Sequence, residues 1–212
     1  MTRSSAYFDY NATAPTLPEV AEAVARVMIE GGNPSSVHGS GRRAHARVEE
    51  ARRKVAALIG ASAKDVIFTG GGTESNALGL KGLIATQMIE RLIVSTTEHP
   101  SVLDLAKAVD VDVAFVPVDS DGLVERDAFC ALLESDQKTL VSIMLANNET
   151  GVIQPIRELV EIARDTGALF HTDADQAAGK IPVDFKDLAF DLLTLSAHKL
   201  AAPQVVGALA PQ

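Results

Sequence analysis

The stretch at residues 192–199 reads Leu-Leu-Thr-Leu-Ser-Ala-His-Lys, a short apolar run that closes on polar side chains. Its apolar half has the length and composition of a buried β-strand. Ser196, His198 and Lys199 then stand where that strand ends, which is where ligands bind in an open α/β sheet. Taken alone, Lys199 is either an ordinary solvated charge or a reactive amine, and the remaining sequence has to decide between them.

The whole chain alternates between strand-like and helix-like segments. Such alternation implies right-handed crossovers, and it predicts an α/β fold with a mostly parallel sheet and helices on both faces. We therefore expect an N-terminal arm over residues 1–17 and one α/β domain over residues 18–212. The expected strands cover residues 66–69, 92–95, 113–118, 140–145, 168–171 and 192–195, and the expected helices cover 18–30, 42–59, 73–86, 100–109, 126–133 and 156–166.

Composition excludes several classes of protein. A net charge of -9 over 212 residues argues against a nucleic-acid partner, and no apolar run approaches the roughly 20 residues that cross a membrane. The single cysteine, Cys130, excludes an internal disulfide and any multi-cysteine metal site, and nothing at the N-terminus resembles a signal peptide. We therefore expect a cytoplasmic protein with no membrane or nucleic-acid partner.

A triple glycine follows the expected strand at 66–69. Because Gly70-Gly71-Gly72 precedes a helix start, its backbone N–H groups can approach a ligand closely, and the positive end of the helix favours a phosphate. The alternative is an ordinary tight turn capped by Thr73 or Ser75. A nucleotide P-loop is excluded, because the Gly-Lys-Ser/Thr ending is absent.

Asp173 and Lys199 follow two further expected strands, so both should lie at the same edge of the sheet as the triple glycine. Pyridoxal phosphate needs a carboxylate that keeps its pyridine nitrogen protonated, a lysine that forms a Schiff base, and a phosphate site. The alternative for Asp173 is a helix cap for a segment that starts near Asp175. The three requirements together predict a pyridoxal phosphate site.

A metal site is the rival interpretation of the same region. His171, Asp173 and Asp175 alternate along an extended segment and would project to one face, which is a spacing suited to a divalent metal. A metal-dependent hydrolase is therefore a second hypothesis, although it leaves Lys199 and the triple glycine unexplained.

Several longer motifs occur in order along nearly the whole chain. They are Tyr-Phe-Asp-Tyr-Asn-Ala-Thr-Ala-Pro at 7–15, Gly-Asn-Pro-Ser-Ser at 32–36, Phe-Thr-Gly-Gly-Gly-Thr-Glu-Ser-Asn at 68–76, Thr-Glu-His at 97–99, Asn-Asn-Glu-Thr-Gly at 147–151, His-Thr-Asp-Ala-Asp-Gln at 171–176 and Ser-Ala-His-Lys at 196–199. In this order they resemble the cysteine desulfurases, within the class V aminotransferase group of fold-type I pyridoxal phosphate enzymes. The resemblance implies the large domain of that fold and a homodimer.

The resemblance also implies a reaction and a set of site residues. L-cysteine or a close analogue would be converted to L-alanine, and its sulfur would pass as a persulfide to acceptors in iron-sulfur cluster assembly or other sulfur metabolism. Lys199 would bind the cofactor covalently, Asp173 would pair with the pyridine nitrogen, and His99 would stack on the ring and move protons. The resemblance further implies that the phosphate is held by Gly72, Thr73, Ser196 and His198, the ring oxygen by Gln176, and the substrate side of the ring by Asn148.

The chain departs from the family pattern at its end and beside the lysine. Family members are much longer, and their persulfide-forming cysteine and small C-terminal domain would lie beyond Gln212. Cys130 does not match that nucleophile, since it lies in an expected amphipathic helix. Ala202 and Val205 stand where the family usually has glycine, and a positive φ there would cost roughly 1 kcal/mol or more. An inactive truncated homologue is therefore a third hypothesis.

Overall fold

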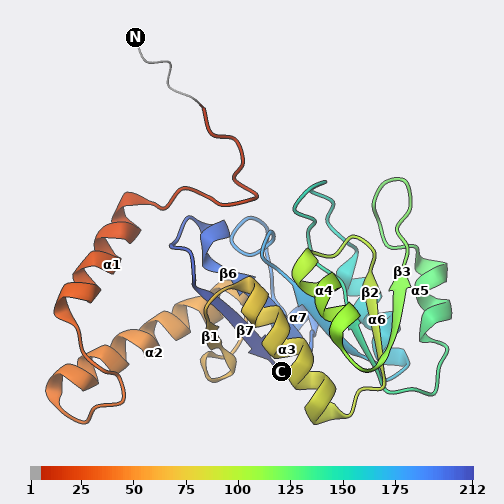
Figure 1. Cartoon of the computed structure of the whole chain (residues 1–212), viewed down its shortest axis with the longest axis horizontal. Coiled ribbons are helices and arrows are strands. Elements are labelled where there is room, and N and C mark those ends of the chain that lie inside the picture. The colour runs from red at the N-terminus through yellow and green to blue at the C-terminus, as the bar shows by residue number, and fades with distance from the viewer. Residues whose placement is uncertain (1–5) are drawn as a thin grey trace.

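One seven-stranded sheet organises the computed structural model, which describes residues 6–212 (Figure 1). The strands are β1 (Ile67–Thr69), β2 (Arg91–Ser95), β3 (Asp112–Val116), β4 (Thr139–Ser142), β5 (Leu169–Asp173), β6 (Leu192–Ser196) and β7 (Gly207–Pro211). Their order across the sheet is β1-β7-β6-β5-β4-β2-β3. β7 is antiparallel to β1 and β6, and the other pairings are parallel. The predicted fold class, a mostly parallel sheet in an α/β fold, is confirmed.

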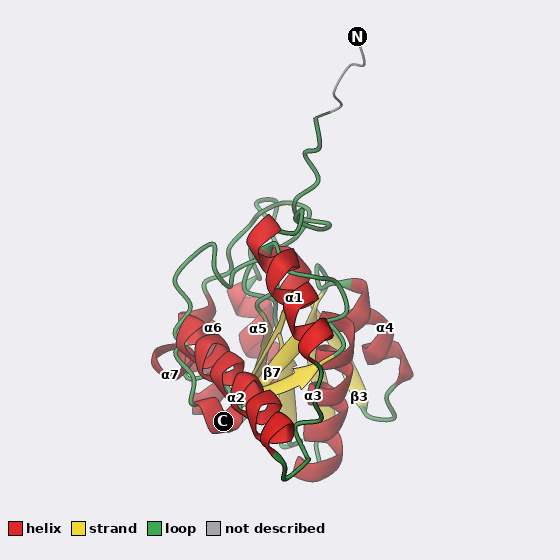
Figure 2. Ribbon diagram, turned by 90° about the vertical axis from the view of Figure 1, so that its left-hand side faces the viewer, coloured by secondary structure: helices red, strands yellow, loops and turns green. Residues whose placement is uncertain are grey.

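Helices cover both faces of this sheet, as Figure 2 shows. α3 and α4 pack on one face, where Leu80, Val102 and Leu105 meet Leu92 and Leu140 of the strands. The end of α2 and the helices α5 and α6 pack with other strand side chains in a second cluster. The helices are α1 (Pro18–Glu30), α2 (Gly39–Ile59), α3 (Gly72–Gln87), α4 (Pro100–Ala108), α5 (Arg126–Leu133), α6 (Ile156–Asp165) and α7 (Phe185–Leu188), with 3-10 turns η1 (Ala63–Asp65) and η2 (Ala197–Leu200).

Two glycines let α3 lie close against the central strands. A Cβ atom on Gly79 would lie 2.5 Å from Cδ2 of Leu192 in β6, and one on Gly72 would lie 2.5 Å from Oδ2 of Asp175. With any larger residue at these positions, either the neighbouring side chain or the helix would have to shift, because such contacts are far inside van der Waals distance. The glycines therefore fix the amino end of α3 beside the residues that follow β5.

The structure departs from the expected elements at a few boundaries. β7 was missed, because Gly-Ala-Leu-Ala-Pro lacks the β-branched and aromatic residues that mark strands. The expected strand at 140–145 ends at Ser142, although the N–H groups of Ile143 and Leu145 still donate to the carbonyls of His171 and Asp173. β5 extends to Asp173, so this carboxylate belongs to the strand's last residue.

Residues 6–17 run along the carboxyl edge of the sheet without forming a helix or strand. The backbone N–H groups of Ala14 and Leu17 donate to the carbonyls of His198 and Ala201, at 2.9 and 3.0 Å. α1 follows and stands off from the sheet with no buried residue (Figure 1). Among residues 6–212, no helix is both long enough and apolar enough to cross a membrane.

Two residues without a glycine's freedom have a positive φ at the end of η2 and in the loop after it. The sequence suggested such strain at Ala202 and Val205, and the structure shows it at Ala201 and Val205. Val205 has φ 63°, as expected, whereas Ala201 with φ 56° takes the left-handed conformation that we expected at Ala202. The shift arises because Ala201 closes the 3-10 turn, where its N–H donates to the carbonyl of Ala197. A left-handed conformation is most costly for a β-branched residue such as Val205.

We therefore predict that Val205→Gly stabilises the protein by about 1 kcal/mol, because the strain is relieved. Little burial is lost, since Val205 is 78% exposed. The free energy of unfolding in urea measures the effect. Val206→Gly is the matched control, since Val206 lacks a positive φ, and it should destabilise by roughly 0.5–1 kcal/mol. A destabilising Val205→Gly would show that the loop is not strained there.

Candidate functional site

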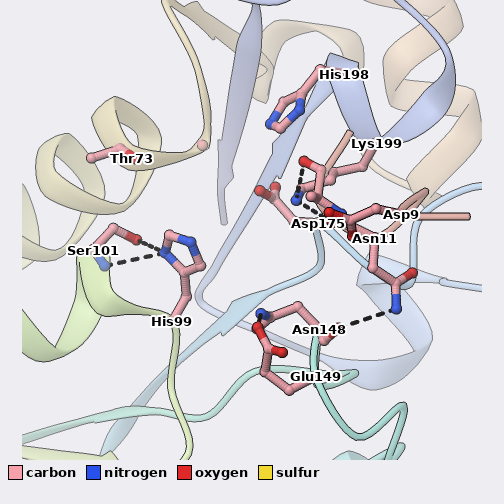
Figure 3. A pocket seen from close by; sticks show the side chains of 12 residues that line it. Asp9, Asn11, Thr73, His99, Ser101, Asn148, Glu149, Asp175, His198 and Lys199 are labelled. Carbon is pink, nitrogen blue, oxygen red and sulfur yellow. Dashed lines mark hydrogen bonds between the residues drawn. The ribbon is translucent and has the colours of Figure 1, made fainter. Parts of the chain in front are cut away.

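A cavity of about 530 Å³ opens at the carboxyl edge of the parallel strands. Its walls come from the arm, the starts of α3 and α4, the loops after β4 and β5, and η2 (Figure 3). This is the edge at which polar residues were expected to gather. The predicted site residues that line the cavity are Gly72, Thr73, His99, Asn148, His198 and Lys199.

The other predicted site residues lie at or below the floor of this cavity. Asp173 and Gln176 line a narrow recess that shares His99, Asn148 and Lys199 with it. Ser196 is fully buried, and its hydroxyl donates to Oδ2 of Asp175 at 2.7 Å. The structure thus places the predicted site residues close together. Ser196 does not line the cavity itself, but it bonds to Asp175, which does.

A buried hydrogen-bond network orients Asp173, which is 4% exposed. Its Oδ2 accepts from Nδ2 of Asn76 at 2.8 Å, and its Oδ1 accepts from the backbone N–H of Asp175 at 2.9 Å. Asn76 in turn donates to Oγ of Ser101 and accepts from the hydroxyl of Thr194. The carboxylate is therefore fixed, and its oxygens keep lone pairs that can accept from a ligand. The Asp173 carboxylate thus closes the turn after β5 and also lines the recess, and among residues 6–212 no helix begins near Asp175 for it to cap.

Asn76 was missed at the sequence level, although a signal was present. The buried positions of α3 recur at helical spacing and include Ser75, Asn76 and Leu80. A polar residue on that stripe must find a partner inside the protein. The stripe could therefore have identified Asn76 as part of a buried network.

His99 caps α4 and is held by one ring nitrogen. Its Nδ1 accepts from the backbone N–H of Ser101 at 3.1 Å and lies 2.8 Å from the hydroxyl of the same residue. Because Nδ1 accepts, the neutral ring carries its proton on Nε2. The Nε2–H of His99 can therefore donate a hydrogen bond while Nδ1 keeps the ring in place.

Glu98, beside His99, is a second buried carboxyl that sequence reasoning missed. Its Oε1 accepts from the backbone N–H of Met144 at 2.7 Å, and its Oε2 has no partner among the described residues. Burial, helped by the charge of Asp173, raises the pKa of Glu98 well above its usual range. Through its bond to Met144, Glu98 ties the His99 loop to the loop after β4. Nδ2 of Asn147 adds a second tie by donating to the carbonyl of Thr97.

Lys199 projects its amine toward the arm at the mouth of the cavity (Figure 3). The amine donates to the carbonyl of Ala12 at 2.9 Å and also to that of Asn11. Gln176 holds the same segment, since its Nε2 donates to the carbonyl of Asn11 at 2.8 Å. Burial and the nearby charges of Lys199 and His99 lower the pKa of His198.

The metal site proposed for His171, Asp173 and Asp175 is wrong. Nδ1 and Nε2 of His171 lie 2.8 and 3.2 Å from the hydroxyls of Ser142 and Thr194, and burial lowers its pKa to about 3. Within residues 6–212, no group of three His, Cys, Asp or Glu side chains is placed to hold a metal ion. His171 is therefore a neutral core residue that bridges β4 and β6.

Comparisons with known proteins agree with this architecture. The cysteine desulfurase IscS of Dictyoglomus turgidum is 44% identical over 209 residues, which cover 96% of this chain and 53% of that protein. A cysteine desulfurase of Cereibacter sphaeroides is 45% identical over 210 residues, which cover 96% and 54%. The solved structure of a NifS-like protein superposes with a TM-score of 0.92 at 38% identity and covers 97% of this chain and 58% of that one. The chain thus spans about half the length of the curated relatives it matches.

A family model covers almost all of the described residues. The model of the class-V aminotransferases matches residues 6–211, which include the arm, every strand of the sheet and η2. This match agrees with the resemblance carried by the sequence motifs. The chain belongs to the aminotransferase class-V family.

Proposed function

We propose that residues 18–212 form the pyridoxal phosphate-binding domain of a cysteine desulfurase, with the preceding arm covering its site. One observation carries the proposal: Lys199 and the glycine turn at the start of α3 line one cavity, and Asp173 lines the recess that adjoins it. The relatives named cysteine desulfurases support the substrate class. A solved structure titled "SspA in complex with cysteine", 32% identical with a TM-score of 0.90, supports L-cysteine as the substrate.

The residues present fit the cofactor. The cavity of about 530 Å³ is lined on one side by the amino end of α3, whose free N–H groups and partial positive charge suit a phosphate. The recess below ends on Asp173, a fixed carboxyl group that suits a pyridinium N–H. Lys199 lines both the cavity and the recess, so its amine can reach a ring carbonyl between them.

Each residue then has a role that its geometry supports. Bound pyridoxal phosphate would supply an electron sink for negative charge on the substrate's α-carbon. Lys199 would bind the cofactor covalently, Asp173 would keep the pyridine nitrogen protonated, and His99 would stack on the ring and help to move protons. The phosphate would be held directly by Gly72, Thr73 and His198 and by Ser196 through Asp175, the ring oxygen by Gln176, and the substrate side of the ring by Asn148.

The remaining parts of the proposal concern the whole protein. We propose a cytoplasmic homodimer that passes sulfur from L-cysteine to an acceptor in iron-sulfur cluster assembly. The exposed apolar side chains of Met28 and Ile29 on α1, 77% and 86% accessible, support a second copy of the chain as their partner. Cys130 lies in α5 and does not line the cavity, so the proposal gives it no part in sulfur transfer.

Mapping of a reduced cofactor adduct tests the proposal. The chain is mixed with pyridoxal phosphate, its visible absorption is recorded, and borohydride then fixes any lysine adduct for peptide mass spectrometry. We expect a visible band and one dominant adduct, at Lys199. No band, or adducts spread evenly over exposed lysines, would overturn the proposal.

A further inference from the structure

The carboxyl group of Asp175 lies in the cavity wall, and the proposed function assigns it no role of its own. It follows Asp173 by two residues and lies between β6 and the start of α3 (Figure 3). Its Oδ2 accepts from the hydroxyl of Ser196 at 2.7 Å and would lie 2.5 Å from a Cβ atom on Gly72. Its Oδ1 is buried and has no hydrogen-bond partner among the described residues.

This position coincides with the proposed phosphate site. Gly72 and Ser196 were both expected to hold the phosphate, and Asp175 contacts both. A bound phosphate carries a charge of about -1.5 to -2 near neutral pH. An ionised carboxylate beside it would repel it, whereas a neutral carboxylic acid could donate an O–H hydrogen bond to a phosphate oxygen.

The surroundings of Asp175 favour the neutral acid. Burial, followed by the negative charge of Asp173 at the end of β5, raises the pKa of Asp175 to about 7. The hydroxyl of Ser196 and the ammonium group of Lys199 oppose this rise. The other charged or titratable groups that face Asp175 around the cavity or interact with it are Asp9, His99, Glu149, Lys180 and His198.

We propose that Asp175 determines the affinity of the site for the cofactor's phosphate, which it binds as a neutral hydrogen-bond donor and repels once it is ionised. This inference rests on the proposed function, since it assumes pyridoxal phosphate as the ligand. Proton binding to Asp175 and phosphate binding are then linked. Affinity for pyridoxal phosphate falls as the pH rises through the ionisation of Asp175, whereas affinity for pyridoxal, which lacks the phosphate, does not respond to Asp175.

Binding curves over a range of pH test this linkage. The dissociation constants of pyridoxal phosphate and of pyridoxal are measured by calorimetry between about pH 6 and pH 8.5, for the wild-type chain and Asp175→Asn. Asparagine keeps the size of the side chain and remains a donor at every pH. The titration of the free phosphate is the same in both experiments, and pyridoxal reports any change at the Lys199 amine. The part of the difference that appears with pyridoxal phosphate and not with pyridoxal therefore isolates Asp175.

We expect the ratio of wild-type to Asp175→Asn dissociation constants for pyridoxal phosphate to rise by up to tenfold per pH unit above about 7. The same ratio for pyridoxal should stay flat. Asp175→Ser, a second variant that checks against a folding defect, should lose the same pH dependence. Glu149→Gln is the matched control, because Glu149 lines the same cavity but is exposed, and it should keep the wild-type profile.

Two outcomes would overturn the inference in distinguishable ways. Parallel pH profiles for pyridoxal phosphate in the wild-type chain and both Asp175 variants would overturn it while leaving the proposed function standing. No binding of pyridoxal phosphate by any of these proteins at any pH would overturn the proposed function and this inference with it.

Discussion

Lys199→Ala is expected to abolish the visible absorption band that pyridoxal phosphate gives with this chain. The band depends on a covalent bond to an amine, and Lys199 is the lysine that lines both the cavity and its recess. Noncovalent contacts to the phosphate and the ring would remain, so weak binding should persist without the band. Absorption spectra over a titration with cofactor measure the loss.

Lys180→Ala is the control that makes this prediction sharp. Lys180 lies near the site, since its amine donates to Oε1 of Gln176 at 2.6 Å. Burial, followed by the positive charge of Lys199, lowers its pKa, which makes Lys180 the strongest rival nucleophile nearby. Its replacement should leave the band in place. A band that survives Lys199→Ala and disappears in Lys180→Ala would contradict the prediction, because it would show that Lys180 forms the covalent bond.

Cofactor binding should release the Lys199 amine from the arm, which follows from the same geometry. The amine of Lys199 donates to the carbonyls of Asn11 and Ala12, and it must leave them to bond to a cofactor. Gln176 and the backbone of His198 still hold the arm after that change. The arm should therefore stay against the site, which agrees with its proposed role as a cover.

The sequence predicts those candidate site residues whose positions depend only on the order of strands and loops along the chain. Asp173 ends a strand, Lys199 and the glycine turn each follow one, and parallel strands bring such positions to one edge regardless of the details of packing. Local pattern also predicts the amphipathic helices, since their buried faces recur at regular spacing. Both kinds of inference need only periodicity and topology, and a single sequence supplies both.

Pairings across the fold could not be predicted in this way. His171 fits a metal ligand by spacing, and only the packing of β4 and β6 shows that hydroxyls occupy both of its nitrogens. The contact between Glu98 and Met144 joins residues that lie 46 positions apart. Similarly, the strain expected at Ala202 falls on Ala201, because the length of a short 3-10 turn depends on its hydrogen bonds.

Asn76→Ala should destabilise the protein by roughly 2–4 kcal/mol, because it leaves several buried polar groups without a partner. Asn76 is 1% exposed, and its amide connects Oδ2 of Asp173 with the hydroxyls of Thr194 and Ser101. The bond to the carboxylate is charge-assisted, which makes it the strongest of these contacts. The free energy of unfolding in urea measures the loss. Asn148→Ala is the control, since Asn148 is partly exposed and its side chain bonds, within residues 6–212, only to Glu149. It should cost under about 0.5 kcal/mol.

A double-mutant cycle separates this network from simple loss of packing. Thr194→Val removes the hydroxyl that donates to Oδ1 of Asn76 and nearly conserves volume. If the network acts as a unit, the two substitutions together should cost about 0.5–3 kcal/mol less than the sum of the single changes. Additive costs would mean that the bond between Asn76 and Thr194 is not coupled to the rest of the network. The same variants should also bind pyridoxal phosphate more weakly, because Asp173 loses the partner that orients it toward the ring. A destabilised Asn76→Ala with unchanged affinity would show that the backbone N–H of Asp175 orients the carboxylate without Asn76.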